Sequence, residues 1–473
     1  MISEEPDKFS QSIDFNLRET DFLLDGENMY RHDLLEREAM VKSLTTAISA
    51  FAGRPHAIAI NGSYGIGKSV FLKMLAEDIR ATHKSIKVVE INSWENDYRE
   101  PIEVLMSATK DLFDSIPKWK AWLEPLVQKI TPAAAGTVAT VATGLTPTNQ
   151  IVKASTELFI DRIISPKHPL QRLKAGLEGV SKRRKSPLVI IVDELDRCKP
   201  THAIRLIELV KHFFCVTNMH FVFGFHMDQL SHSVQGIYGQ TFDGFSYLER
   251  FFDFVVTLPP GPLFSIFKEQ IKESGLQVRS EGQDMSDGVR FARELIESTE
   301  AHLSARMISR WASLVISIVA MTPSDKLWFM WGTVGMTFIR LLLPSDFDDF
   351  IEKRISDSQM WDSLLEFGIQ DMAEKAGQQN YIVPKLSAIL IAVHHELHGV
   401  RRLPVGTENA ETPLAKKFEK SETDKNHHEA LRFANSLIAN ERFHRSSSAN
   451  RVGARFVIKR IKWLVYSEQR TAY

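Results

Sequence analysis

Short apolar runs alternate with longer amphipathic stretches over the first 260 residues of the chain. Five of these runs have the length and composition of a strand: residues 57–60, 87–91, 188–192, 220–225 and 254–258. The stretches between them repeat apolar residues three and four positions apart, which is the spacing of an amphipathic helix. One such helix, over residues 33–51, precedes the first strand. This alternation predicts an α/β fold with a parallel sheet.

The pattern changes after residue 263, from where it is helical almost to the C-terminus. Residues 327–343 are strongly apolar, but Arg340 interrupts them, and a membrane-spanning helix needs about 20 apolar residues. We predict a buried helix of a mostly α-helical C-terminal domain at this place. A membrane segment is the alternative.

A long insert, about residues 101–186, separates the second and third predicted strands. Helical spacing recurs within it at residues 102–113, 119–130 and 154–164. The segment of residues 132–145 carries no charge, and prolines and glycines bracket or interrupt it. Its length of about fourteen residues is shorter than a membrane span needs. We predict a small-residue loop or a buried helix there, with a membrane-touching hairpin as the alternative.

Length, charge and cysteine content exclude several classes of protein. A chain of 473 residues exceeds one ordinary core and predicts two or three domains. A formal net charge of −1 disfavours a surface made wholly for nucleic acid, although the first forty residues are acidic and the last thirty basic. Two cysteines are too few for a disulfide framework or a zinc ribbon. Because the acidic N-terminus is unlike a secretory signal, we expect a cytoplasmic protein.

The segment between the first strand and the next helix fits the pattern G-x-x-x-x-G-K-[ST] at every fixed position. Its glycines let backbone amides point inward at phosphate oxygens that a Cβ would crowd. Lys68 supplies a positive charge, and the Ser69 hydroxyl is placed to bind magnesium. The sequence therefore predicts a phosphate-binding loop at the start of a helix, formed by Gly62, Ser63, Tyr64, Gly65, Ile66, Gly67, Lys68, Ser69 and Val70.

Two carboxylates, Asp193 and Glu194, follow the most apolar of the predicted strands. Charge at the end of a buried strand is costly unless it meets a cation or takes part in chemistry. We predict that Asp193 holds magnesium and that Glu194 orients and polarises the attacking water. An acidic loop after an ordinary strand is the alternative.

Other polar residues are weaker candidates for the same site. His226 and Asp228 follow the fourth strand, where a polar side chain can sense a γ-phosphate. Arg197 either pairs with Asp196 or reaches toward phosphate. Arg306 lies on a helix of the C-terminal part and is a candidate for contacting phosphates, with a surface charge as the alternative.

The C-terminal tail, residues 442–470, alternates basic with apolar side chains. A basic amphipathic helix of this kind can lie on an anionic membrane surface, bind nucleic acid or dock on a partner protein. Docking on the protein's own helical domain is the fourth interpretation, and the sequence leaves all four open.

From about residue 33 to about residue 310 the chain resembles the KAP-family P-loop NTPases. The resemblance is carried most specifically by the string D-E-L-D-R-C after an apolar strand and by the segment Y-L-E-R. It rests on Asp33 and Arg37, the phosphate loop, Trp94, residues 193–198 and residues 247–250.

The resemblance implies a sheet of strand order 5-1-4-3-2 with a catalytic glutamate beside the magnesium-binding aspartate. It also implies that Arg37 contributes to nucleotide binding and that Arg250 and Arg306 contribute to catalysis. The chain departs from the family at Glu194 and His226, because the family has Asp commonly at the first position and tends to have an acid at the second. Many members carry membrane helices in the insert, and bacterial members are associated with phage exclusion and other defence.

The sequence thus predicts an acidic lead-in over residues 1–30, a P-loop NTPase domain over 31–260 with the helical insert, and an α-helical lid and C-terminal domain over 261–473. We expect a magnesium-dependent ATPase that couples ATP hydrolysis to a conformational change, alone or with a partner, in the cytoplasm or at the membrane periphery. Two alternatives are a nucleotide-binding scaffold with little turnover and a nucleic-acid-associated ATPase.

Overall fold

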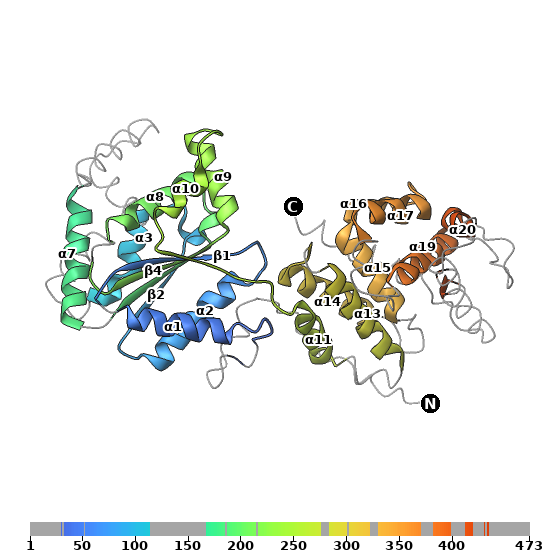
Figure 1. Ribbon diagram of the computed structural model, residues 1–473, viewed down its shortest axis with the longest axis horizontal. Helices are drawn as coiled ribbons and strands as arrows, with labels where there is room; N and C mark the ends of the chain where they lie inside the picture. Colours follow the sequence, from blue (N-terminus) through green and yellow to red (C-terminus); the bar gives the residue numbers. More distant parts are fainter. Residues whose placement is uncertain are drawn as a thin grey trace, which may run out of the picture. The chain divides into compact units, whose positions relative to one another are not determined.

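Figure 1 shows the computed structural model of the chain. The structure describes residues 30, 33–51, 53–113, 167–184, 187–213, 216–275, 283–299, 302–321, 330–369, 382–398, 412–419, 430 and 433–434. The chain divides into two compact units, one of Leu17–Pro259 and one that includes Pro260–Tyr473. Each unit is described by itself.

The first unit is built on a parallel sheet of five strands. These are β1 (His56–Asn61), β2 (Lys87–Asn92), β3 (Leu188–Asp193), β4 (Met219–Phe225) and β5 (Phe254–Thr257). Their order across the sheet is β2-β3-β4-β1-β5, which is the predicted order 5-1-4-3-2 counted from the other edge. All five strands that the apolar runs predicted are confirmed. The register places Asn92 opposite Asp193 and Asn61 opposite Phe225, so the carboxyl ends of the strands lie together.

Helices cover both faces of this sheet (Figure 1). On one face α1 (Glu38–Ala50) and α2 (Lys68–Thr82) pack on side chains that include Ile58, Ile60 and Val222. The other face carries the alternate side chains of the same strands, and its layer includes α3 (Pro101–Ala108), α7 (Lys167–Arg184), α8 (Pro200–Lys211), α9 (Met227–Tyr238) and α10 (Gly244–Glu249). Every residue of β4 is buried, as expected of a strand with helices on both sides.

The segment before the first strand differs from its prediction. A helix was predicted from residue 33, but α1 begins at Glu38. Glu36 has a positive φ of 55°, which a continuous right-handed helix does not tolerate. The Asp33 carboxylate accepts a hydrogen bond of 2.7 Å from the Glu38 amide and so satisfies one of the first free N–H groups of the helix.

The described part of the second unit is helical. It consists of α11 (Leu263–Glu273), α13 (Gln283–Thr299), α14 (Ala305–Ala320), α15 (Met330–Leu342), α16 (Pro344–Ile351), α17 (Asp357–Glu366), α19 (Ile382–His398) and α20 (Pro413–Glu419). The buried helix that residues 327–343 predicted is confirmed by α15, whose residues 330–339 are all buried. The indole of Trp311 in α14 donates a hydrogen bond of 2.9 Å to the hydroxyl of Thr337 in α15.

Several predictions fall on other parts of the chain. Residues 1–29, the helices predicted over 119–130 and 154–164, the uncharged residues 132–145 and the basic tail 442–470 lie outside the described residues. Each helix in the described part of the chain is too short or too polar to cross a membrane.

Candidate functional site

The predicted phosphate loop joins the end of β1 to the start of α2. Gly65 and Gly67 have φ angles of 76° and 97°, in the left-handed region that glycine adopts without strain. A Cβ on Gly62 would lie 2.8 Å from Cγ2 of Ile66, so the loop also curls too tightly for a larger residue there. Because α2 begins at Lys68, the loop ends at the positive end of a helix dipole.

Lys68 is the cation of this loop. Its ammonium group donates hydrogen bonds of 2.8 Å to the Gly62 carbonyl and 3.2 Å to the Ser63 carbonyl. It also lies 3.7 Å from Oδ2 of Asp196, whose side chain is 2% exposed. Burial lowers the pKa of Lys68, although the carboxylates of Asp196 and Asp193 act in the opposite direction. The ammonium group is therefore held among carbonyl and carboxylate oxygens at the mouth of the loop.

Asp193 and Ser69, the two residues predicted to hold magnesium, are linked by a side-chain hydrogen bond. Burial raises the pKa of the Asp193 carboxyl, while a hydrogen bond with the Ser69 side chain and one from the Glu194 amide lower it. The Asp193 carboxylate approaches β4 so closely that a Cβ on Gly224 would lie 2.8 Å from its Oδ1. One hydroxyl and one carboxylate oxygen side by side are hard ligands of the kind that Mg²⁺ binds, usually with water and phosphate oxygens completing its shell. The residues present fit this ion.

Glu194 lies beside this pair, at the first residue after β3. It has a positive φ of 58°, which turns the chain sharply away from the strand direction. Its carboxylate forms an ion pair of 2.8 Å with Arg197 and a hydrogen bond with Asn92 of β2. Burial raises the pKa of Glu194, and Arg197 acts against that rise.

The sequence offered two partners for Arg197, Asp196 and phosphate. In the structure Arg197 pairs with a third group, Glu194. Its guanidinium group pairs with Glu194 and lies 5.5 Å from the centre of the Trp94 ring. Asp196 turns to the other side, toward Lys68. The 3₁₀ turn η4 (Leu195–Arg197) explains this divergence, because consecutive residues of a helical turn point in different directions.

Asp196 itself is a site residue to which the sequence analysis gave no role. Its Oδ2 accepts a hydrogen bond of 2.8 Å from the His226 amide, and its carbonyl accepts one of 3.3 Å from the Tyr64 hydroxyl. The spacing Asp193-x-x-Asp196 was the available signal, since residues three apart in a turn return to the same side.

Of the two other polar residues predicted near this site, His226 reaches the loop. Its ring meets the ring of Tyr64 edge-on with centroids 5.8 Å apart, while its Nε2 lies 3.5 Å from Oδ2 of the exposed Asp228. Tyr64 is 43% exposed and also lies near Lys68, whose Nζ is 5.4 Å from the centre of the ring. Tyr64 thus leans over the mouth of the loop.

The three predicted arginines occupy different places. Arg37 is 3% exposed and donates a hydrogen bond to the Pro259 carbonyl at the end of the first unit. Arg250 is exposed at the end of α10, three residues before Asp253, which binds the Ala57 amide at the amino end of β1. Arg306 belongs to the first turn of α14 in the second unit. The functional roles of these arginines stay predictions.

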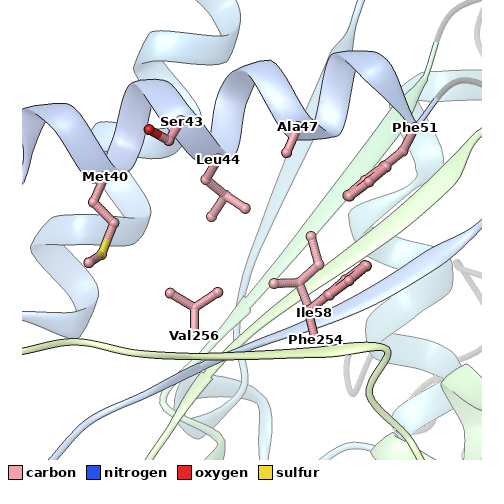
Figure 2. Close-up of a pocket in the computed structure, with 8 residues that line it drawn as sticks. All are labelled: Met40, Ser43, Leu44, Ala47, Phe51, Ile58, Phe254 and Val256. Atoms are coloured by element: carbon pink, nitrogen blue, oxygen red, sulfur yellow. The ribbon is translucent and has the colours of Figure 1, made fainter.

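An apolar pocket of about 280 Å³ lies between α1 and the edge of the sheet (Figure 2). The side chains of α1 point toward those of β1 and β5 across it, and its lining is Met40, Ser43, Leu44, Ala47, Phe51, Ile58, Phe254 and Val256. None of these side chains carries a charge or takes part in the phosphate loop. The pocket is therefore separate from the site described above.

A phosphate loop after β1, with a half-buried pair of carboxylates, Asp193 and Glu194, at the end of β3 of the same parallel sheet, is the arrangement of a P-loop NTPase. The sequence matches the model of the KAP family P-loop domain over residues 37–367, which is more than half of the chain. The protein therefore belongs to the KAP family, and this membership implies that it binds a nucleotide.

Other comparisons add less. A search of curated proteins finds no match. Among solved structures, the Aeropyrum pernix ORC2 protein in its ADPNP–ADP complexes shares 13% identity, over 87% of this chain and 86% of that one, with a TM-score of 0.37. The Drosophila ORC bound to GC-rich DNA and Cdc6 shares 12%, over 86% and 63%, with a TM-score of 0.34. PCH-2 of C. elegans shares 12%, over 63% and 66%, with a TM-score of 0.28. At such TM-scores these likenesses say nothing about the function of this chain.

Proposed function

We propose that this protein is a magnesium-dependent ATPase. The observation that carries the proposal is the meeting of Lys68, Ser69 and Asp193 at the carboxyl ends of β1 and β3, with Glu194 directly beside them. Lys68 would bind the terminal phosphates, and the backbone amides of the phosphate loop would surround them. Ser69 and Asp193 would hold Mg²⁺, which when bound supplies positive charge to the reacting phosphate oxygens.

In the proposed reaction a water molecule attacks the γ-phosphorus of ATP. A bond forms between the water oxygen and that phosphorus, and the bond from phosphorus to the β,γ-bridging oxygen breaks. The products are ADP, inorganic phosphate and a proton. The Glu194 carboxylate would orient the water and accept a proton from it as general base. Lys68 would stabilise the negative charge that develops on the departing ADP.

The wider role rests on family resemblance alone. We propose that hydrolysis drives a conformational change of the kind used in bacterial anti-phage defence, in a protein of the cytoplasm or the membrane periphery. Contact with nucleic acid or with a partner protein through the basic tail belongs to the same proposal. Phosphate release measured with and without DNA, RNA and anionic vesicles tests that part.

The central test measures nucleotide binding and phosphate release separately, with ATP and Mg²⁺. Lys68→Ala should weaken ATP binding, because it removes the cation that faces the phosphates. Glu194→Gln has nearly the same shape and should keep binding while phosphate release falls by about 10² to 10⁴. Lys73→Ala, on the same helix, is a matched control that should change neither. The proposed mechanism is wrong if Lys68→Ala or Glu194→Gln hydrolyses ATP at the wild-type rate. Binding without turnover in the wild type would favour a nucleotide-binding scaffold.

A further inference from the structure

We propose that Arg197 is a positioning residue that, backed by the ring of Trp94, fixes the Glu194 carboxylate beside Asp193. This inference rests on the proposed ATPase function, in which Glu194 orients the attacking water. Arg197 would act through Glu194 and would itself touch neither nucleotide nor metal.

The ion pair between Arg197 and Glu194 is sheltered. Their side chains are 28% and 15% exposed, and the nearest nitrogen and oxygen are 2.8 Å apart. Pairs of this kind are screened less by solvent and salt than surface pairs, so they restrain geometry more firmly. The same turn is also tied through its backbone, because the Arg197 amide donates a hydrogen bond of 3.2 Å to the Glu194 carbonyl.

Glu194 needs such a restraint because of the charges around it. The carboxylates of Asp193 and Asp196, on either side of it in the chain, both repel its negative charge. Its other polar partner is the Asn92 amide, which is neutral. Within the described part of the chain, the contacts of Glu194 include one cation, and that cation is Arg197. Loss of the guanidinium group would leave two repulsive neighbours and one amide to place the carboxylate.

Trp94 completes the arrangement from the neighbouring strand. It begins the 3₁₀ turn η2 (Trp94–Asn96) after β2, and its amide donates a hydrogen bond of 3.1 Å to the Asn92 side chain. The Arg197 guanidinium lies 5.5 Å from the centre of its ring, within the range of a cation–π interaction. Trp94 is 51% exposed, and exposing so large an apolar side chain to water costs free energy. Its contact with the Arg197 guanidinium offsets part of that cost.

Two other roles for Arg197 predict outcomes that differ from those of a positioning role. If its ion pair restrained Glu194 away from the reaction, its removal would raise turnover. If Arg197 bound a phosphate, its removal would weaken ATP binding by a large factor. A positioning role predicts that turnover falls while nucleotide affinity stays the same.

The test compares Arg197→Ala, Arg197→Lys, Trp94→Phe and Trp94→Ala with wild type. A matched control is Lys199→Ala, because Lys199 follows the same turn and its side chain is 67% exposed. For each protein one measures kcat, the Kd for ATP with Mg²⁺, the melting temperature, and the tryptophan emission with its quenching by acrylamide.

We expect Arg197→Ala to lower kcat at least tenfold with a Kd within threefold of wild type. Arg197→Lys should recover part of the rate, since it keeps the charge without the planar fork. Trp94→Phe should keep most of the rate and Trp94→Ala should lose a part of it. Arg197→Ala should also shift the tryptophan emission and increase quenching, and this change should be absent in the Trp94→Phe background.

The outcomes separate the inference from the function on which it rests. A wild-type protein that does not hydrolyse ATP overturns both. A wild type that hydrolyses ATP, together with an Arg197→Ala protein of equal or higher kcat, overturns the inference alone. A fall in affinity that matches the fall in kcat would overturn it too, because Arg197 would then contact the nucleotide. If Arg197→Ala has a much lower melting temperature than wild type, the same criteria are applied to Arg197→Lys and Trp94→Ala instead.

Discussion

The ammonium group of Lys68 lies 3.7 Å from the carboxylate of Asp196, a residue from the turn that follows another strand. The contact places a negative charge beside the cation of the phosphate loop. Asp196 is also held by the His226 amide at the end of β4, so its carboxylate cannot simply turn away. The carboxylate of Asp196, which lies outside the phosphate loop, would therefore compete with a bound phosphate for Lys68.

Replacement of Asp196 by Asn should tighten nucleotide binding. The amide oxygen can still accept the hydrogen bond from His226, while the repulsion between carboxylate and phosphate disappears. We expect the Kd for ATP to fall about tenfold, since two charges about 4 Å apart interact by a few kcal/mol at most near a protein surface. Isothermal titration calorimetry of ATP in the presence of Mg²⁺ measures this Kd. Glu273→Gln, at an exposed position of α11, is the control; weaker binding by Asp196→Asn would contradict the prediction.

Gly224→Ala should both destabilise the sheet and disturb the proposed magnesium site. The new Cβ would lie 2.5 Å from Cδ1 of Leu72 and 2.8 Å from Oδ1 of Asp193, so both neighbours must move. We expect a loss of about 1–3 kcal/mol in the free energy of unfolding and weaker Mg²⁺-dependent ATP binding. Gly236→Ala is the matched control, because no atom lies within 4 Å of its Cβ position. Equal melting temperatures for the two variants would refute this prediction.

Thr337→Val should destabilise the helical unit. Trp311 is buried, and valine has the shape of threonine without the hydroxyl that accepts the indole hydrogen bond. A buried donor left without an acceptor costs about 1–3 kcal/mol. Urea unfolding followed by tryptophan fluorescence measures the loss. Ser313→Ala removes a hydroxyl that donates a hydrogen bond to the Ser309 carbonyl of its own helix, and it should change stability by less than about 0.5 kcal/mol.

The buried His220 should make the protein less stable in mild acid. It lies in β4 with no exposed surface, and within the described residues neither ring nitrogen has a hydrogen-bond partner. Burial lowers the pKa of His220 to about 4, with a further contribution from His56. Because the unfolded chain binds this proton near pH 6.5 and the folded chain only near pH 4, stability falls as the pH drops through that interval.

The loss amounts to about 3 kcal/mol at pH 4 relative to pH 7. His220→Phe should remove this part of the pH dependence, whereas His232→Gln, at an exposed position, should keep it. Urea unfolding at several values between pH 7 and pH 4 gives the slope. Equal slopes for wild type and His220→Phe would show that His220 does not titrate in this way.

The sheet could be predicted from sequence because its signals are local. A run such as residues 188–192 is apolar along its whole length, which is the pattern of a strand covered on both faces. The phosphate loop could be predicted for a similar reason, since glycine spacing and backbone curvature are properties of one short segment. The strand order came from family resemblance, because no local pattern determines which strands lie side by side.

The pairing of charges could not be predicted. Arg197 and Asp196 are adjacent in sequence, yet one faces Glu194 and the other faces Lys68, and the direction of each depends on a single 3₁₀ turn. Glu36 shows the same limit, because its positive φ interrupts a helical pattern that continues through its position. Directions of side chains after an irregular turn depend on contacts from distant strands, which sequence periodicity does not contain.

The hydrogen bond from Arg37 to the Pro259 carbonyl links the segment before α1 to the last residue of the first unit. Two residues earlier, Cδ1 of Leu35 lies 3.0 Å from where a Cβ of Gly67 would be. Residues 33–37 thus touch the phosphate loop at one end and hold the last residue of the unit at the other. A shift of the loop of a few tenths of an ångström would therefore displace Leu35, and through it the buried Arg37 that binds Pro259.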